Sequence, residues 1–166
     1  MPEILEFGLD SNTYALDISY TREIVNSLPV TPIPRAPDYI VGMTNIRGEI
    51  TTIISLCRII DSTGAGAGPG QPVSPTQKFV ILVSEVAKGD KVGFIVDDVY
   101  SVIFVPDADV DYSFSGDAPG KKSFIKGVIR LRGDRAVPGD EECMDRLILY
   151  LDIDKVLSHI FELAKR

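Results

Sequence analysis

The chain has 166 residues, of which 45% are hydrophobic and 25% charged, a length that suits one ordinary globular domain or two very small ones. It is too short for a barrel enzyme of about 250 residues. Asp and Glu total 24 against 17 Lys and Arg, and this net charge of −7 argues against a nucleic acid or an anionic membrane as the main partner.

Most of the chain consists of short runs of β-branched and aromatic residues that are separated by Gly, Pro, Asn and Asp. Such runs predict strands. Because this many short strands exceed one small sheet, they favour barrels or a sandwich, in which strand edges are protected. The predicted strands cover residues 4–9, 14–18, 23–28, 42–46, 49–56, 79–83, 91–96, 101–105, 124–132 and 146–152.

Residues 61–77 interrupt the strands with a segment rich in Gly and Pro. Its central part has no large apolar side chain to bury, so it predicts a flexible loop that divides the chain. The first unit comprises about residues 14–61, and the second comprises about 78–150 together with the N-terminal strand. A phosphate-binding loop is the alternative, but no Lys-Ser/Thr pair follows the glycines.

The last segment changes to a helical period. Ile153, Val156, Leu157 and Ile160 form one apolar stripe, which predicts an amphipathic helix over residues 152–165. A stripe on a terminal helix favours packing on the strands over binding a partner helix.

Residues 39–49 and 124–134 repeat one pattern at an offset of 85. An aromatic residue, Ile, Gly, an Arg-Gly pair and an acid recur in the same register. A second match, residues 55–60 against 152–157, has an offset of 97, which leaves 97 − 85 = 12 extra residues, assigned to an insertion at 135–146. Unless this similarity is accidental, it predicts two similar β units packed across a shared apolar face.

Side chains for catalysis or metal binding are few. The single His, His159, has no nucleophile beside it in the sequence and is expected to be a solvated helix residue. Residues 107–111 resemble the start of a calcium loop, but Tyr112 and Ala118 replace the required Gly and Glu. The sequence therefore predicts no catalytic residue, no metal and no cofactor.

The two cysteines and the apolar runs indicate where the protein acts. Two cysteines far apart in a chain without an apolar signal segment suit a reducing cytosol. The longest apolar runs are much shorter than the roughly 20 residues that cross a bilayer, so we expect no membrane insertion.

Arg47 follows a predicted strand and precedes Gly48. A guanidinium held on a rigid turn suits a carboxylate, either Glu23 within the fold or an acid on another protein. From the residues alone, the prediction is a soluble all-β interaction domain.

Several motifs along the chain belong to one known pattern. They are Tyr14-Ala-Leu-Asp-Ile18, Arg22-Glu-Ile24, Pro32-Ile-Pro-Arg-Ala-Pro37, Ile40-Val-Gly-Met-Thr-Asn-Ile-Arg-Gly-Glu-Ile50, Val92-Gly-Phe-Ile-Val-Asp97 with Asp98-Val99, Phe124-Ile-Lys-Gly127 and Leu147-Ile-Leu-Tyr-Leu-Asp-Ile-Asp-Lys-Val-Leu157. With these motifs the sequence resembles the CheW-like family of chemotaxis adaptors over nearly the whole chain and in the family's order. This resemblance implies a mainly β fold of two SH3-like five-stranded β-barrels that share a core, followed by the C-terminal helix.

The resemblance implies a non-catalytic cytoplasmic adaptor that is recruited to membrane-bound receptor arrays. It would couple the tips of methyl-accepting chemoreceptors to the regulatory domain of the histidine kinase CheA. An alternative is a module for a small acidic ligand or a nucleotide, bound by Arg47 and its repeat counterpart Arg132. Thr52 and Ser55 depart from the family pattern, which affects partner specificity more than fold.

The site residues are carried over by position. Arg47 matches the Arg of the family's Asn-Leu-Arg-Gly motif, and Glu23 is its expected ion-pair partner. The alternatives are that the motif glycines serve only the turn and that Ile24 belongs only to the core. The predicted partner-binding residues are Glu23, Ile24, Gly42, Asn45, Arg47, Gly48 and Val99, with Ile24 and Val99 as the wall of a groove between the two units.

Overall fold

The computed structural model describes residues 3–9, 12–60, 73–83, 91–112, 124–131 and 146–164. All ten predicted strands are confirmed, and the two-residue strand β9 is added to them. The strands are β1 Glu3–Leu9, β2 Asn12–Asp17, β3 Thr21–Asn26, β4 Ile40–Ile46, β5 Glu49–Ser55, β6 Lys78–Leu82, β7 Val92–Val96, β8 Asp98–Phe104, β9 Val110–Asp111, β10 Ile125–Leu131 and β11 Arg146–Leu151. The α-helices are α1 Leu56–Ile60 and α2 Ile153–Ala164, and short 3₁₀ helices cover Ile18–Tyr20 and Asp107–Asp109.

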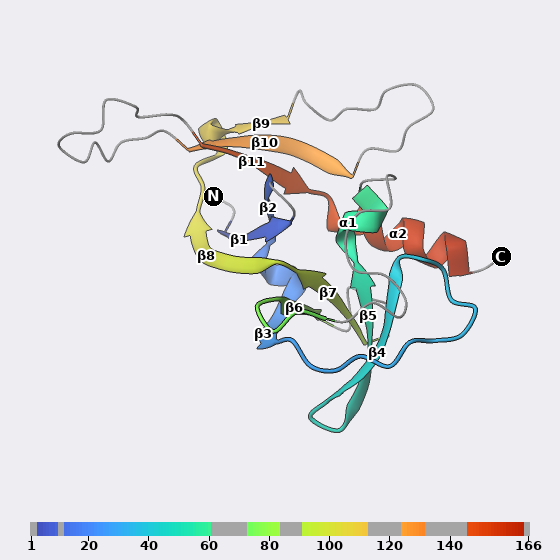
Figure 1. Cartoon of the computed structure of the whole chain (residues 1–166). Coiled ribbons are helices and arrows are strands. Elements are labelled where there is room, and N and C mark those ends of the chain that lie inside the picture. The colour runs from blue at the N-terminus through green and yellow to red at the C-terminus, as the bar shows by residue number, and fades with distance from the viewer. Residues whose placement is uncertain are drawn as a thin grey trace.

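The strands form two sheets (Figure 1). The six-stranded sheet has the order β8-β1-β2-β11-β10-β9, and the five-stranded sheet has the order β3-β6-β7-β5-β4. Within the described ranges, each sheet contains one parallel pair, β2–β11 and β5–β7 respectively, and its other pairs are antiparallel. The mainly β class is therefore confirmed.

The predicted closure of each sheet into an SH3-like barrel is not confirmed. In the part of the chain that the structure describes, no backbone ladder joins the two end strands of either sheet. The chain after β3 contains several prolines, which lack the N–H donor that a ladder needs. Within the described part of this proline-rich segment, the single backbone bridge to β4 joins Thr31 to Met43 through two hydrogen bonds of 2.8 Å.

The strand grouping differs from the predicted division into residues 14–61 and 78–150. Strands β6 and β7 follow the predicted loop but belong to the sheet of β3, β4 and β5. Strand β2 precedes β3 but belongs to the other sheet. The reason is that two parallel strands need a crossover connection between them. The connection from β5 to β7 runs through α1 and β6, and it places β7 beside β5.

Part of the predicted loop is described. Residues 61–72 and most of the predicted insertion 135–146 lie outside the described residues. The segment 73–77 is held against β3, because the Ser27 N–H donates to the Gln77 carbonyl at 3.2 Å and the Ser27 hydroxyl donates to the Ser74 carbonyl at 2.9 Å.

The sequence repeat corresponds to two equivalent hairpins, β4–β5 and β10–β11. Each has an irregularity just before its glycine, Gly42 or Gly127. At the end of each hairpin, a backbone N–H donates at 2.7 Å to the carbonyl of the aromatic residue that begins the repeat, Tyr39 in one case and Phe124 in the other. A helix follows each hairpin, α1 after β5 and α2 after β11.

The equivalence extends to the rest of both sheets. Strands β3, β6 and β7 of the five-stranded sheet correspond to β8, β1 and β2 of the six-stranded sheet, with the same pairing directions. The second unit is therefore circularly permuted, because the N-terminal strands β1 and β2 supply the two strands that would follow α2.

The described residues form three apolar clusters. One contains Ile4, Ala15 and Ile129 of the six-stranded sheet, and another contains Val41 and Phe79 of the five-stranded sheet. The largest cluster draws buried residues from both sheets, and it is the predicted shared core. The stripe of α2, namely Ile153, Val156, Leu157 and Ile160, belongs to it.

The α2 helix is close to its predicted position, at Ile153–Ala164, and packs on the strands. His159 is not simply solvated, because its Nδ1 is buried and its ring centroid lies 5.3 Å from that of Phe124. Among the described residues, no helix is long and apolar enough to cross a membrane.

Candidate functional site

The tip of the β4–β5 hairpin carries the predicted Asn-Ile-Arg-Gly motif. Ile46 pairs with Glu49, so Arg47 and Gly48 form a two-residue turn. Their φ angles are 51° and 83°, and positive values at both central positions identify a type I′ turn. The Asn45 side-chain oxygen accepts a hydrogen bond of 2.9 Å from the Gly48 N–H. Gly48 therefore serves the conformation of the turn, which displays Arg47.

The predicted ion pair between Arg47 and Glu23 is confirmed. Arg47 Nη1 lies 3.1 Å from Glu23 Oε2, and 78% of the arginine side chain is exposed against 18% of the glutamate. The pair connects the hairpin to β3, although these elements lie at opposite ends of the strand order. Most of the guanidinium remains available to a partner's carboxylate.

A second bridge joins the same two regions. Arg22 of β3 lies 3.4 Å from Glu49 at the start of β5, and Lys91 also contacts this glutamate. The hydrogen bond from Lys91, together with the positive charges of Lys91 and Arg22, lowers the pKa of the Glu49 carboxyl below its usual value. Side chains thus bring together two end strands that no backbone ladder joins in the described ranges.

Gly42 lies on β4 where the proline-rich segment passes closely. A Cβ atom at this position would lie 2.3 Å from the Thr31 carbonyl oxygen and 2.6 Å from Val30 Cγ1. Gly42 therefore permits the Thr31–Met43 bridge. Because Gly42 has no side chain, it affects the surface only through this close approach.

A shallow apolar hollow lies beside the hairpin. Its lining contains three large apolar side chains that are exposed to solvent, Leu28, Met43 and Ile50. None of these three was among the predicted partner-binding residues, although Met43 and Ile50 lie inside the motif of residues 40–50. The remaining lining residues are Pro29, Thr31, Thr44 and Asn45.

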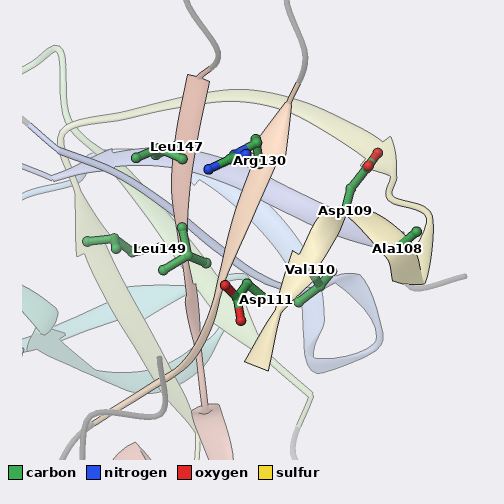
Figure 2. A pocket seen from close by; sticks show the side chains of 8 residues that line it. Ala108, Asp109, Val110, Asp111, Arg130, Leu147 and Leu149 are labelled. Carbon is green, nitrogen blue, oxygen red and sulfur yellow. The ribbon is translucent and has the colours of Figure 1, made fainter. Parts of the chain in front are cut away.

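The six-stranded sheet has an equivalent hollow beside β10 and β11 (Figure 2). Its Val128, Arg130 and Leu147 take the positions of Met43, Asn45 and Ile50 in the repeat. Figure 2 shows Asp109 and Asp111 on the side of this hollow that β9 and the preceding 3₁₀ helix form. The hollow near the Arg47 hairpin is therefore lined by uncharged residues, whereas its counterpart carries charges of both signs.

Ile24 and Val99 lie on the edge strands β3 and β8, in different sheets. Ile24 is opposite Val80 and Val99 is opposite Phe7, and both of these partners belong to the shared core. Directly opposite residues point to the same face, so both candidates lie on the sides where the sheets face the shared core. Ile24 is 39% exposed, whereas Val99 packs partly against the core.

Two further residues of β8 extend this apolar edge. Val102 and Phe104 are 45% and 65% exposed, and Val102 is opposite the buried core residue Leu5. The sequence signal for these two residues was the run 102–105, in which every residue is apolar, so neither face of the predicted strand is polar. The structure thus brings Glu23, Asn45, Arg47 and Gly48 together, and it leaves Ile24 and Val99 on separate strands.

Over the described ranges, no group of three or more His, Cys, Asp or Glu side chains could hold a metal ion. The arrangement that is present, an exposed guanidinium beside an apolar hollow, is suited to contact with another protein.

The comparisons with known proteins all point to one family. The family model described as "CheW-like domain" matches residues 3–161. The chain is 28% identical over 158 residues to "Chemotaxis protein CheW" of Thermotoga maritima, covering 95% of this chain and 89% of that protein. It is 34% identical over 128 residues to the protein of the same name in Treponema pallidum, covering 77% and 72%.

A solved structure is also similar. The crystal structure of the scaffolding protein TtCheW from Thermoanaerobacter tengcongensis superimposes with a TM-score of 0.65 at 26% sequence identity. The match covers 91% of this chain and 89% of that chain.

Proposed function

Because this chain belongs to the CheW-like domain family, we propose that it is a non-catalytic chemotaxis adaptor that couples chemoreceptors to the histidine kinase CheA. The observation that carries this function is the family match over residues 3–161. Coupling of this kind requires two partners whose binding free energies depend on each other, and no bond has to form or break.

The hairpin surface is our candidate for contact with the kinase's regulatory domain. Exposed Arg47 lies in the turn next to the hollow that contains Met43 and Ile50. Arginine and methionine are enriched in protein interfaces, and arginine is frequent among the residues that contribute most of the binding energy. Glu23 holds Arg47 from one side and orients the guanidinium toward a partner.

The edges of β3 and β8 are our candidate for the receptor tip. Ile24 and Val99 would form the two walls of a groove over the shared core, and Val102 and Phe104 would enlarge the second wall. An apolar helix is the type of ligand that such a surface accepts. The adaptor would act in the cytoplasm, without a cofactor, at receptor arrays in the membrane.

The test is a pull-down with CheA and with a receptor cytoplasmic fragment. We expect the wild type to bind both and Arg47→Glu to lose at least one of them. Arg35→Glu is the matched control, because Arg35 is also an exposed arginine with a positive φ, 62°, but lies outside the hollow. No binding by the wild type would refute the function, and unchanged binding by Arg47→Glu would refute the site.

The alternative ligand, a small acid or a nucleotide, receives no comparable support. Arg132, the second arginine of that hypothesis, lies outside the described residues, and Arg47 already contacts Glu23. A rise in melting temperature with a nucleotide would favour this alternative.

A further inference from the structure

Asp17, Lys126 and Tyr150 form a polar cluster in the six-stranded sheet. The Tyr150 hydroxyl donates a hydrogen bond to Asp17 Oδ1, and Lys126 Nζ lies 3.1 Å from Asp17 Oδ2. The same Nζ lies 4.2 Å from the centroid of the Tyr150 ring. Tyr150 is only 2% exposed, and about a quarter of each charged side chain is exposed, 22% for Asp17 and 29% for Lys126.

The internal repeat shows what occupies the same three positions in the other sheet. Gly127 is opposite Tyr150 as Gly42 is opposite Ile53, so Tyr150 corresponds to Ile53. Counting one residue back from each glycine, Lys126 corresponds to Val41.

Asp17 is placed by the neighbouring strands. Ala15 is the parallel partner of Tyr150 as Gly93 is that of Ile53, so Asp17, two residues on, corresponds to Ile95. Val41, Ile53 and Ile95 are all buried members of one apolar cluster. The five-stranded sheet therefore has an entirely apolar set at these three positions, whereas the six-stranded sheet has a charged pair and a tyrosine hydroxyl.

Stability does not explain this difference. Replacing a buried ionic group by well-packed apolar residues is often neutral or stabilising, whereas polar groups can be retained because they specify one arrangement of the chain. The cluster is therefore expected to specify one arrangement of the strands that it joins.

The cluster lies beside a short backbone contact within the six-stranded sheet. The parallel contact between β2 and β11 has two residue pairs, against four between β5 and β7. Asp17 is the last residue of β2; it pairs with Ile4 of β1 but lies two positions beyond Ala15, the last residue that pairs with β11. Lys126 and Tyr150 reach it across 109 and 133 positions of sequence. Side chains thus continue the contact where the ladder ends.

Asp17 also begins the connection between the two sheets. The 3₁₀ helix Ile18–Tyr20 follows it directly, and β3 starts at Thr21. Glu23 and Ile24, the β3 residues of the candidate site, lie only a few residues further along. A fixed position for Asp17 therefore fixes where β3 enters the five-stranded sheet relative to β8.

We propose that Asp17, Lys126 and Tyr150 are positioning residues, which set the position of β3 relative to β8 and thereby the receptor-binding surface. This inference rests on the proposed adaptor function. The residues contact no partner themselves and act through Ile24 and Val99.

The test separates affinity from stability. A triple variant, Asp17→Ile, Lys126→Val and Tyr150→Ile, installs the residues of the equivalent positions. We expect its melting temperature to equal or exceed that of the wild type, and its affinity for a receptor cytoplasmic fragment to fall roughly fivefold or more. Wild-type affinity in this variant would overturn the proposal.

Tyr150→Phe decides the question if the triple variant does not fold, because it removes only the hydroxyl. Weaker receptor binding with an unchanged melting temperature supports a positioning role. A lower melting temperature with unchanged affinity, or no change in either, overturns it.

Tyr39→Phe is the control, because it removes another buried tyrosine hydroxyl at a position where the repeat has Phe124. It should bind the receptor fragment as the wild type does. If the wild type itself does not bind the fragment, the adaptor function fails, and this outcome is distinct from equal binding by wild type and variants.

Discussion

Arg47→Asn should separate the binding role of Arg47 from its role in the fold. The substitution removes the ion pair with Glu23, which is worth at most about 1 kcal/mol because the arginine side chain is 78% exposed. It also places Asn at φ 51°, a left-handed conformation that costs most residues roughly 1 kcal/mol and that Asn tolerates better. The two effects oppose each other, so the free energy of unfolding should change by less than about 1 kcal/mol.

The affinity for the kinase's regulatory domain should fall much more. An arginine at the centre of an interface commonly contributes about 2 kcal/mol or more, so we expect a loss of at least tenfold. Urea unfolding followed by circular dichroism measures the first quantity, and titration calorimetry measures the second. A stability loss above roughly 2 kcal/mol would show that the pair is structural, and unchanged affinity would show that Arg47 is not at the interface.

Three further predictions follow from single contacts. Gly42→Ala should destabilise the chain by about 2 kcal/mol because its Cβ would lie 2.3 Å from a backbone oxygen, whereas the equivalent Gly127→Ala, at 3.1 Å, should cost less in the same urea assay. Ile50→Asp should leave the melting temperature nearly unchanged, since Ile50 is 60% exposed, but should weaken kinase binding in calorimetry. Burial and the hydrogen bond to Asp154 raise the pKa of Tyr20 from 10.0 to about 12. The contribution of Tyr20 to stability is therefore complete below pH 10 and is lost as the pH rises toward 12. Ultraviolet titration of the wild type and of Tyr20→Phe can follow this ionisation.

Local sequence patterns predicted the repeated hairpins well. The aromatic residue, the glycine and the Arg-Gly turn each have a local physical reason, because Tyr39 is buried, Gly42 permits a close backbone contact and Gly48 has a positive φ. The ion pair between Glu23 and Arg47 was also predictable, since the family motif supplied both residues.

The assignment of strands to sheets was not predictable from the residues. The pairing of β2 with β11 joins residues more than 130 positions apart, and no periodicity within either strand encodes it. The second wall of the predicted groove was incomplete for a related reason. Val102 and Phe104 look like core residues in the sequence, and only the edge position of β8 leaves them exposed.

The permuted order of the second unit affects how the chain can fold during synthesis. The five-stranded sheet uses only residues between Thr21 and Val96, so all its strands are available before β8 and the later strands emerge from the ribosome. The hairpin β1–β2 is made first but contacts β11, which is made nearly last. Contacts of such long sequence separation form slowly, and the exposed edge of β2 has to wait for them. A nascent chain that stalls before residue 146 would therefore present an unpaired strand to chaperones or to other chains.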